Sequence, residues 1–222
     1  MLIAIEGIDG SGKGTQTTAL AEKFKASGFD TSVFRFPQYE ETLFGREVGR
    51  YLNGDYGSLE QVHPKFSALL YAMDRRQATR NIKAALGLGH VVICDRYTGS
   101  NIAHQCARAP DAEKQQLAQW IATVEEEILE IPPADLVFFL DVETHQSKSL
   151  VALKDARSYT SKTHDLHEES EDHLSAALNQ FRRLAERPNW IRIQCNDANG
   201  NLRLRSEITE ELFERSAHVR RR

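Results

Sequence analysis

A glycine-rich segment near the start of the chain places the strongest constraint on its fold. An apolar run, residues 2–5, leads into residues 7–13 (GIDGSGK), and a helical pattern follows over residues 13–27. This is the spacing of a phosphate-binding loop, in which a glycine is followed by four residues and then by Gly-Lys. The glycines let backbone N–H groups turn towards phosphate oxygens, and the helix start adds its dipole. An ordinary glycine-rich turn is the structural alternative.

The lysine and the residues after it define the phosphate chemistry expected of this segment. Lys13 is expected to reach the outer phosphates as a point charge. Gly14 stands directly after the lysine, where Ser or Thr is usual, and the hydroxyl comes one residue later at Thr15. The residues predicted to bind ATP are Gly7, Ile8, Asp9, Gly10, Ser11, Gly12, Lys13, Gly14 and Thr15.

Length, composition and charge indicate one globular domain over residues 1–222. The chain is 41% hydrophobic and 27% charged, which is typical of a globular protein with a sizeable core. Its formal charge of −4 gives no reason to expect nucleic-acid binding, and no apolar stretch approaches the length of a membrane span. Three cysteines without metal-ligand spacing fit a reducing setting, so we expect a cytoplasmic protein.

Short apolar runs alternate with helical patterns along the whole chain. The predicted strands are residues 2–5, 31–36, 91–94, 136–140 and 190–194. The predicted helices are residues 13–27, 64–86, 112–130, 169–186 and 206–216. Continuous hydrophobicity in the strands indicates burial on both faces, as in a parallel sheet. The pattern predicts an α/β fold of the P-loop NTPase type, with a five-stranded parallel sheet flanked by helices in three layers.

Asp95 and Arg96 directly follow the third predicted strand, at the edge of the sheet where open α/β proteins bind their ligands. Asp95 suits a magnesium ion held through water. Arg96 suits phosphate oxygens because a guanidinium donates two parallel hydrogen bonds. A strand-end aspartate that caps the next helix is the structural alternative for Asp95.

Further cations are expected around the phosphates, because phosphoryl transfer depends on charge neutralisation and in-line positioning. Arg35 ends the second predicted strand before Phe36 and Pro37, so it is placed to reach a second phosphate. Residues 150–168 are polar and basic and are predicted to form a lid that brings Arg157 over the phosphates. A solvated loop is the alternative for this segment. The residues expected to act in catalysis are Lys13, Asp95, Arg96 and Arg157.

These segments together resemble the thymidylate kinase family of nucleoside monophosphate kinases, and the resemblance spans nearly the whole chain. The matching segments are residues 5–13, 35–37, 70–75, 95–97 with 100–101, and 165–168. The resemblance implies transfer of the γ-phosphoryl group of ATP to dTMP, giving dTDP. It also implies Mg²⁺ as cofactor, nucleotides as partners and a homodimer as the assembly.

The resemblance implies a role for each residue of the acceptor site. Asp9 is similar to the family carboxylate that contacts the acceptor's 3′-hydroxyl group, and Arg35 and Arg96 are similar to residues that hold its phosphate. Tyr71 stands where an aromatic ring stacks on thymine, and Arg75 where an arginine donates to the O4 edge. Tyr71 and Arg75 lie four apart on one predicted helix and so share a face. The implied substrate-binding residues are Asp9, Arg35, Phe36, Pro37, Tyr71, Arg75, Arg96, Ser100, Asn101 and His104.

Gly14 departs from the family's usual pattern. Gly14 with Thr15 is more similar to adenylate and uridylate-cytidylate kinases than to thymidylate kinases. Without a hydroxyl at position 14, magnesium is expected to be held mainly through water, by Asp95 and Thr15.

Two more positions bear on the acceptor and the lid. Gly10 lacks the basic side chain that some family members carry there, which favours Arg157 as the mobile cation. His104 stands where relatives often have Tyr near the sugar's 2′ position. There are two alternatives to a dTMP kinase. Gly14 and His104 favour a kinase for another pyrimidine monophosphate, such as UMP or CMP. The other alternative is a nucleotide-binding module without turnover.

Overall fold

A computed structural model describes residues 1–151 and 171–217 of the chain. The strands are β1 (Leu2–Glu6), β2 (Thr31–Arg35), β3 (Val91–Asp95), β4 (Leu136–Asp141) and β5 (Trp190–Gln194). The helices are α1 (Lys13–Ala26), α2 (Leu43–Leu52), α3 (Pro64–Gly87), α4 (Thr98–Ala107), α5 (Asp111–Ala122), the π-helix η1 (Thr123–Ile128), α6 (Thr144–Val151), α7 (Glu171–Leu184) and α8 (Arg205–Ser216). Arg157, most of the predicted lid and residues 165–168 lie outside the described residues.

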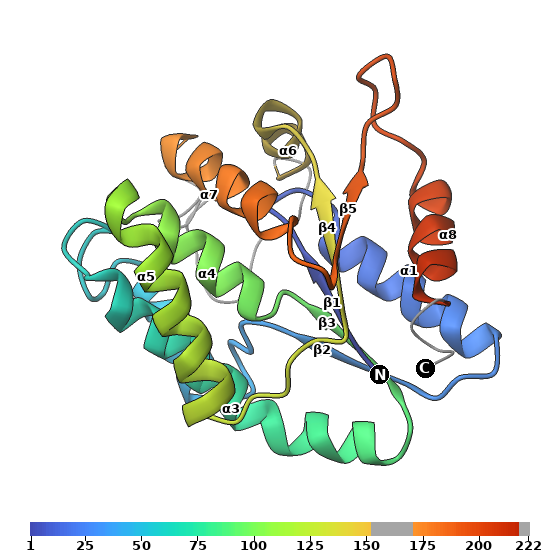
Figure 1. Cartoon of the computed structure of the whole chain (residues 1–222), viewed down its shortest axis with the longest axis horizontal. Helices are drawn as coiled ribbons and strands as arrows, with labels where there is room; N and C mark the ends of the chain where they lie inside the picture. The colour runs from blue at the N-terminus through green and yellow to red at the C-terminus, as the bar shows by residue number, and fades with distance from the viewer. Residues whose placement is uncertain (152–170, 218–222) are drawn as a thin grey trace.

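The five strands form one parallel sheet in the order β2-β3-β1-β4-β5. Figure 1 shows α1 and α8 on one face of this sheet and α3, α4, α5 and α7 on the other. The three-layer α/β architecture predicted from the sequence is confirmed, and each predicted strand is present to within one residue at either end.

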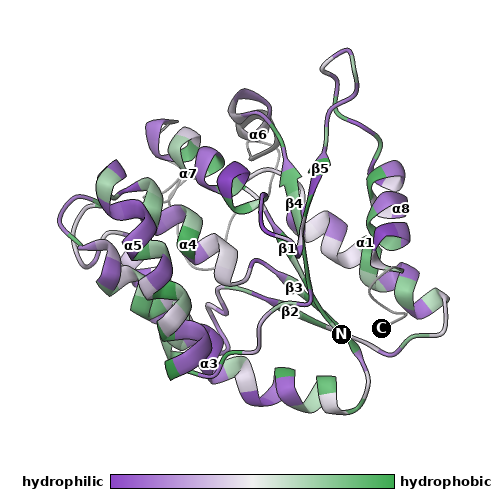
Figure 2. Ribbon diagram, viewed as in Figure 1, coloured by the Kyte–Doolittle hydropathy of each residue, from purple (hydrophilic) through white to green (hydrophobic). Residues whose placement is uncertain are grey.

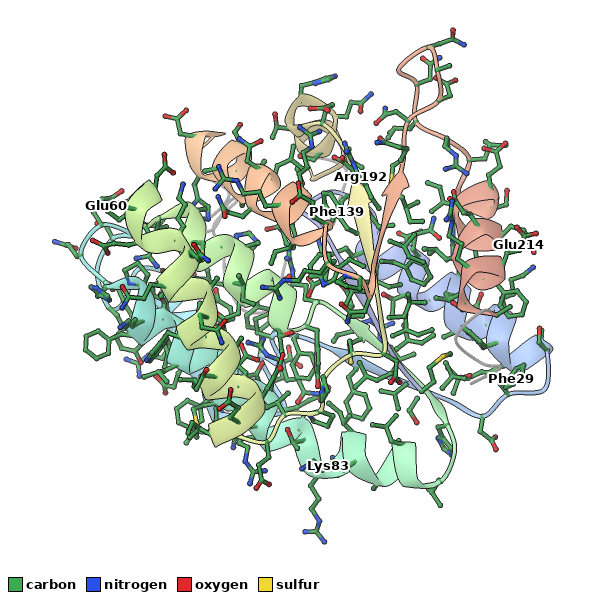
Figure 3. All side chains as sticks on the ribbon, in the orientation of Figure 1. Phe29, Glu60, Lys83, Phe139, Arg192 and Glu214 are labelled. Carbon is green, nitrogen blue, oxygen red and sulfur yellow. The ribbon has the colours of Figure 1, made fainter. Side chains whose placement is uncertain are left out.

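The three central strands, β3, β1 and β4, are almost wholly apolar because each one packs on both faces, whereas the edge strands β2 and β5 carry partly exposed polar residues. In β1, Leu2 and Ala4 belong to the core beneath α3, α4, α5 and α7, whereas Ile3 and Ile5 belong to the core beneath α1 and α8. Figure 2 shows β4 as hydrophobic, β5 as partly hydrophilic and the outer helix surfaces as largely hydrophilic. Phe139 of β4, labelled in Figure 3, stacks on Phe181 of α7 at 5.5 Å between ring centroids. Burial of one such ring stabilises the fold by about 1.5–3 kcal/mol.

The helices depart from the sequence predictions in two ways. Residues 112–130 were predicted as one α-helix, but the α-helix ends at Ala122 and a π-helix follows over Thr123–Ile128. Helices α2, α4 and α6 were not predicted. In α4, all the residues from Gly99 to Cys106 are buried, so burial is not confined to one face of the helix.

Pairing of β3 with its two neighbours brings three predicted site segments to one edge of the sheet. Ile5 of β1 and Arg35 of β2 both lie beside Asp95 of β3 in the register of the strands. The backbone N–H of Arg96 then donates to the carbonyl of Ile5 at 3.0 Å. The glycine-rich loop therefore begins next to Asp95 and Arg96.

Candidate active site

A cavity of about 250 Å³ lies where the glycine-rich loop, β3, α3 and α4 meet. The predicted residues that line it are Asp9, Gly12, Lys13, Gly14, Phe36, Pro37, Tyr71, Arg75, Asp95, Arg96, Ser100, Asn101 and His104. Tyr39, Leu52 and Gln105 also line it. Most of the predicted acceptor site and part of the predicted ATP site are thus brought together.

The glycine-rich loop, residues 7–12, is closed by its own lysine. Lys13 is buried, and its Nζ donates to the carbonyl of Ile8 at 2.7 Å. The hydroxyl of Ser11 is buried and has no hydrogen-bond partner among the described residues. A buried hydroxyl without a partner is unfavourable, and an oxygen-rich ligand bound in the loop would remove that cost.

The backbone conformation and surroundings of Gly10 leave no room for a basic side chain at this position of the loop. Its φ is +80°, and a Cβ there would lie 2.2 Å from the carbonyl oxygen of Ser147 in α6. Because that atom belongs to the backbone, no small side-chain movement relieves the clash. Any residue with a side chain at this position would have to displace α6 from the loop.

Asp95 and Thr15, the predicted magnesium residues, are placed differently. Asp95 lines the cavity, and a Cβ at Gly14 would lie 3.1 Å from its Oδ2, so the missing side chain leaves room for this carboxylate. Thr15 is exposed outside the lining, and its carbonyl accepts from Arg205 at 3.5 Å. Over residues 1–151 and 171–217, no group of three or more His, Cys, Asp or Glu side chains is arranged to hold a metal ion.

Arg96 joins the glycine-rich loop to the cavity wall. Its Nη2 donates to Oδ1 of Asp9 at 2.5 Å, and its Nη1 donates to the carbonyl of Gly7 at 3.2 Å and to Oγ of Ser100 at 3.1 Å. Its φ of +64° is uncommon for a residue with a side chain and costs about 1–3 kcal/mol. Burial alone would lower the pKa of Arg96, but nearby carboxylates, Asp9 foremost, outweigh it and raise the pKa.

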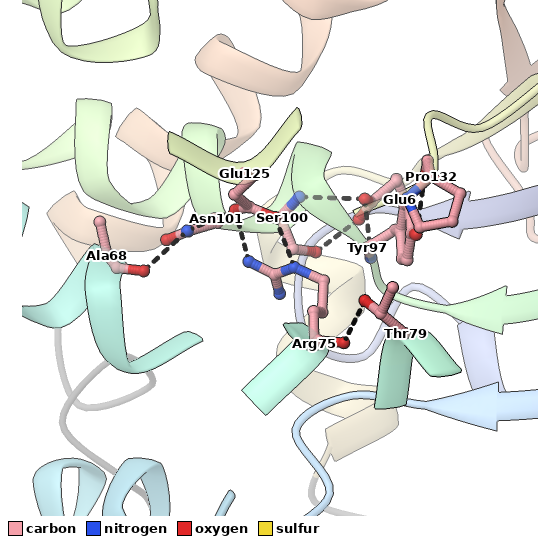
Figure 4. Close-up of polar contacts among 9 residues, drawn as sticks. All are labelled: Glu6, Ala68, Arg75, Thr79, Tyr97, Ser100, Asn101, Glu125 and Pro132. Carbon is pink, nitrogen blue, oxygen red and sulfur yellow. Dashed lines mark hydrogen bonds and ion pairs between the residues drawn. The ribbon is translucent and has the colours of Figure 1, made fainter. Parts of the chain in front are cut away.

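Glu6 is a site residue that the sequence analysis missed. It is fully buried at the end of β1 and accepts from the backbone N–H groups of Tyr97 at 2.9 Å and Ser100 at 3.0 Å (Figure 4). The Ser100 hydroxyl donates to its other oxygen at 2.5 Å. Burial raises the pKa of Glu6, and the Ser100 hydrogen bond and the charge of Arg96 oppose that rise. The available signal was a carboxylate at the end of an apolar strand.

Arg75 is held by a second missed carboxylate, Glu125 of η1. Its Nε and Nη2 donate to the two carboxylate oxygens at 2.7 and 2.6 Å, and the two side chains are 2% and 0% exposed. The amide of Asn101 donates to Oε1 of Glu125 at 2.7 Å and to the carbonyl of Ala68 at 3.0 Å (Figure 4). Burial alone would lower the pKa of Arg75, but the carboxylate outweighs it and raises the pKa.

Nothing in the sequence singled out Glu125, because it lies within the acidic run Glu125–Glu127 of a segment predicted as an ordinary helix. The π-helix widens the turn there, and the N–H of Leu129 donates to the carbonyl five residues back at Val124. Glu125 is buried while Glu126 and Glu127 are exposed.

Tyr71 of α3 and His104 of α4 both line the cavity. The Tyr71 ring meets Tyr51 edge to face at 6.4 Å. Nε2 of His104 lies 3.5 Å from Nη1 of Arg96, and its Nδ1 lies 3.3 Å from Nε2 of His173 on α7. His104 thereby links the arginine at the cavity to the helix that begins at residue 171.

Arg35 is not brought into this cavity. Its Nη2 donates to the hydroxyl of Thr18 on α1 at 3.1 Å. Arg35 instead lines a separate hollow with polar residues of the β2–α2 connection and α3. Phe36 and Pro37, which follow it, do line the main cavity.

The fold and the site together define a class of protein. The central strand of the sheet leads into a phosphate-binding loop, and an arginine-lined cavity lies beside that loop. This arrangement is that of a P-loop phosphotransferase with nucleotide substrates. The chain belongs to the thymidylate kinase family, because the family model described as thymidylate kinase matches residues 5–207.

Individual relatives agree with this family. A thymidylate kinase of Mycobacterium tuberculosis (strain CDC 1551 / Oshkosh) is 35% identical over 64% of this chain and 66% of the relative, so the alignment spans just under two thirds of the relative's length. A thymidylate kinase of Halothermothrix orenii is 32% identical over 96% of this chain and 94% of the relative. The solved structure of thymidylate kinase from Candida albicans matches in fold, with a TM-score of 0.71, 21% identity and coverage of 96% and 89%.

One negative finding concerns membranes. Within the described residues, no helix is both long enough and apolar enough to cross a bilayer.

Proposed function

We propose that this chain transfers the γ-phosphoryl group of ATP to dTMP, giving dTDP. The observation that carries the proposal is the ion pair between Asp9 of the phosphate-binding loop and Arg96 of the cavity wall, at 2.5 Å. It couples the loop that would bind the donor to the arginine that would bind the acceptor phosphate. Phosphoryl transfer requires such a juxtaposition because both substrates must be held in line.

On the donor side, the loop from Gly7 to Thr15 binds the phosphates of ATP, and Lys13 supplies a positive charge to the outer ones. Arg157 remains a predicted lid residue, and we expect Arg157→Ala to reduce turnover more than ATP binding. Residues 1–222 act in this proposal as a single domain with a lid over about 150–168.

On the acceptor side, Arg96 holds the dTMP phosphate and Asp9 accepts from the 3′-hydroxyl group. Tyr71 stacks on thymine, with Phe36 and Pro37 beside it in the same cavity. Ser100 supports Arg96 directly, at 3.1 Å. Arg75, Asn101 and His104 complete the acceptor residues of the proposal. Arg35 belongs to it only if its side chain leaves Thr18 of α1 and turns towards the acceptor phosphate.

Mg²⁺ fits the residues present, provided that substrate phosphates and water complete its ligands. Asp95 faces the cavity beside the loop, and one carboxylate with phosphates and water is the usual protein contribution to such a site. Gly14 leaves the space next to that carboxylate open. Thr15 would act only through water. Once bound, the ion neutralises charge on the transferring phosphate.

The proposal includes a homodimer in the cytoplasm, with neither a nucleic acid nor a membrane as partner. Phe66 at the start of α3 and Leu43 at the start of α2 are 69% and 53% exposed, which suits coverage by a second copy. The three cysteines are buried thiols, which a reducing compartment preserves. Light scattering of the purified chain measures the assembly directly, and a monomeric mass at micromolar concentration would contradict the dimer.

A coupled ADP-release assay with ATP and Mg²⁺ tests the reaction. We expect turnover that depends on dTMP and yields dTDP. UMP turnover far above that of dTMP would overturn the choice of acceptor. Tight ATP binding without turnover on any monophosphate would instead identify a nucleotide-binding module.

A further inference from the structure

Two buried amide atoms in the acceptor cavity have no hydrogen-bond partner among the described residues. They are Oδ1 of Asn101 and Nε2 of Gln105. Both residues line the cavity and lie four apart on α4, so they occupy one face of that helix. One atom is an acceptor and the other a donor, and each is unfavourable while it stays unpaired. Their positions indicate a ligand with complementary polar groups.

The orientation of the Asn101 amide is fixed by its neighbours. Its Nδ2 donates to Oε1 of Glu125 at 2.7 Å and to the carbonyl of Ala68 at 3.0 Å. Both partners are acceptors, so only the amide nitrogen can face them. Asn101 must therefore present its oxygen as the free group.

The orientation of Gln105 is fixed in the opposite sense. Its Oε1 accepts from the hydroxyl of Ser67 at 2.7 Å and from Nη1 of Arg108 at 2.9 Å. Arg108 is held in turn by the hydroxyl of Tyr51 at 3.0 Å and by the carbonyls of residues 59 and 62. Gln105 must therefore present its NH₂ group as the free donor.

Arg75 supplies a second donor on the other side of Asn101. Its Nε and Nη2 are taken by Glu125, whereas Nη1 has no hydrogen bond to the part of the chain that the structure describes. Figure 4 shows this third nitrogen turned away from Glu125. Arg75 and Asn101 share Oε1 of Glu125 and are therefore neighbours. The order on the wall is donor, acceptor, donor, from Arg75 through Asn101 to Gln105.

We propose that Glu125 and Arg108 are positioning residues that fix this order and thereby set which pyrimidine edge the cavity accepts. The inference rests on the proposed function, since it concerns the base of the acceptor monophosphate. Thymine and uracil present an acceptor at O4, a donor at N3–H and an acceptor at O2, which complements the wall. Cytosine presents an amine donor at position 4 and an acceptor at N3, so two of its three groups meet like groups.

The wild-type enzyme tests the order of groups without any variant. We expect kcat/KM for dCMP to be at least about 100-fold below that for dTMP, because a site built to hydrogen-bond one edge rejects another strongly. N3-methyl-dTMP should be rejected to a similar degree, because it lacks the N3–H donor. The kcat/KM for dUMP should fall far less below that for dTMP, since none of these three groups contacts the C5 methyl group that dUMP lacks.

Glu125→Gln tests the positioning role. The new amide offers Asn101 either an oxygen or an NH₂ group, so the orientation of Asn101 is no longer enforced by a carboxylate. We expect the dTMP:dCMP ratio of kcat/KM to fall about tenfold or more, with KM for ATP unchanged. Glu125→Asp keeps the carboxylate and should keep the ratio. Glu127→Gln, at an exposed glutamate of the same π-helix, is the matched control and should behave as wild type.

Arg108→Met separates the two positioning residues. It releases Gln105, which faces O2, and O2 is common to thymine and cytosine. We therefore expect kcat/KM to fall for dTMP and dCMP by similar factors, leaving their ratio unchanged.

The outcomes distinguish this inference from the proposed function. Absence of dTMP turnover in the wild type would overturn the proposed function. The positioning roles would be overturned if the wild type turned over dTMP but its kcat/KM for dCMP lay within about tenfold of that for dTMP. They would also be overturned if Glu125→Gln lowered kcat/KM for both substrates by the same factor. The comparison of dTMP, dCMP, N3-methyl-dTMP and dUMP in the wild type still tests the order of groups if Glu125→Gln fails to fold.

Discussion

The glycine-rich loop and the base-facing wall of the cavity are built by opposite means. The loop is six consecutive residues, 7–12, between β1 and α1, and its shape is a matter of backbone conformation. The wall, formed by Arg75, Asn101 and Gln105 with Glu125 behind them, comes from α3, α4 and η1. Its hydrogen bonds connect residues 24 and 50 positions apart.

This difference determines how each region is expected to respond to a substitution. In the proposed reaction Lys13 serves bound phosphates more than the core, whereas Gly7 and Gly10 also allow neighbouring backbone to approach the loop closely. The wall carries a buried charge on Arg75, whose ion-pair partner, Glu125, also belongs to the wall. A substitution in the wall is therefore expected to disturb folding as well as recognition, whereas replacement of the loop's lysine, Lys13, is expected to disturb chemistry more than folding.

Glu125→Ala should produce the largest effect on stability. It leaves the guanidinium of Arg75 buried without a counter-charge, which typically costs about 3–5 kcal/mol. The measurement is the free energy of unfolding from urea titration. The contrast is Lys23→Ala, which breaks a surface ion pair with Glu210 and should cost no more than about 1 kcal/mol. Equal losses in the two variants would contradict the view that the wall depends on buried charge balance.

Lys13→Met should have the largest effect on chemistry with little effect on folding. In the proposed reaction Lys13 acts on the transferring phosphate, and removal of one such charge should cost about 10³-fold in kcat, equivalent to ~4 kcal/mol of transition-state stabilisation. The thermal midpoint should stay close to that of the wild type, although the hydrogen bond to the carbonyl of Ile8 is lost. The coupled assay and a thermal melt measure the two quantities. A large drop in the midpoint would remove the distinction between loop and wall.

Arg96→Lys probes the junction between the two regions. Lysine keeps the charge but loses the planar fork that contacts Asp9, Gly7 and Ser100 together. We expect kcat/KM for dTMP to fall about 100-fold, with a much smaller change in KM for ATP. If KM for ATP changed by as large a factor as kcat/KM for dTMP, Arg96 would belong to the donor loop and not to the acceptor wall.

The same contrast explains how much the sequence could predict. The loop, the five strands and the cavity position of Asp95 and Arg96 follow from contiguous patterns, and the structure confirms the three-layer fold. Tyr71 and Arg75 were found through a family resemblance, and the structure places both on the cavity.

Residues that depend on long-range contacts were not predictable. Glu125 contacts Arg75 from a π-helix that stands where an α-helix was expected. No residue type in that segment predicts a π-helix. Gln105 lies on α4, a helix that was not predicted and whose residues from Gly99 to Cys106 are all buried. Arg35 was assigned to the acceptor phosphate by its place in the sequence, but its side chain turns to Thr18 on α1.

Glu6→Gln should give the smallest effect and tests the point at which both regions meet. Glu6 ends β1 just before the loop and anchors the start of α4, which carries the wall. The amide oxygen of the variant can accept from the backbone N–H groups of Tyr97 and Ser100, and its NH₂ group can donate to the Ser100 hydroxyl. The variant should therefore fold.

The pH dependence of stability is the informative readout for this variant. Burial raises the pKa of Glu6 above 4.5, so between pH 4.5 and the raised value the folded wild type binds more protons than the unfolded chain. Its free energy of unfolding must then fall relative to that of Glu6→Gln as pH rises through this window. Urea titrations of both proteins at a series of pH values measure the difference. A flat or rising difference would mean that Arg96 and Ser100 compensate the burial of Glu6 fully, and that the junction of loop and wall carries no cost of its own.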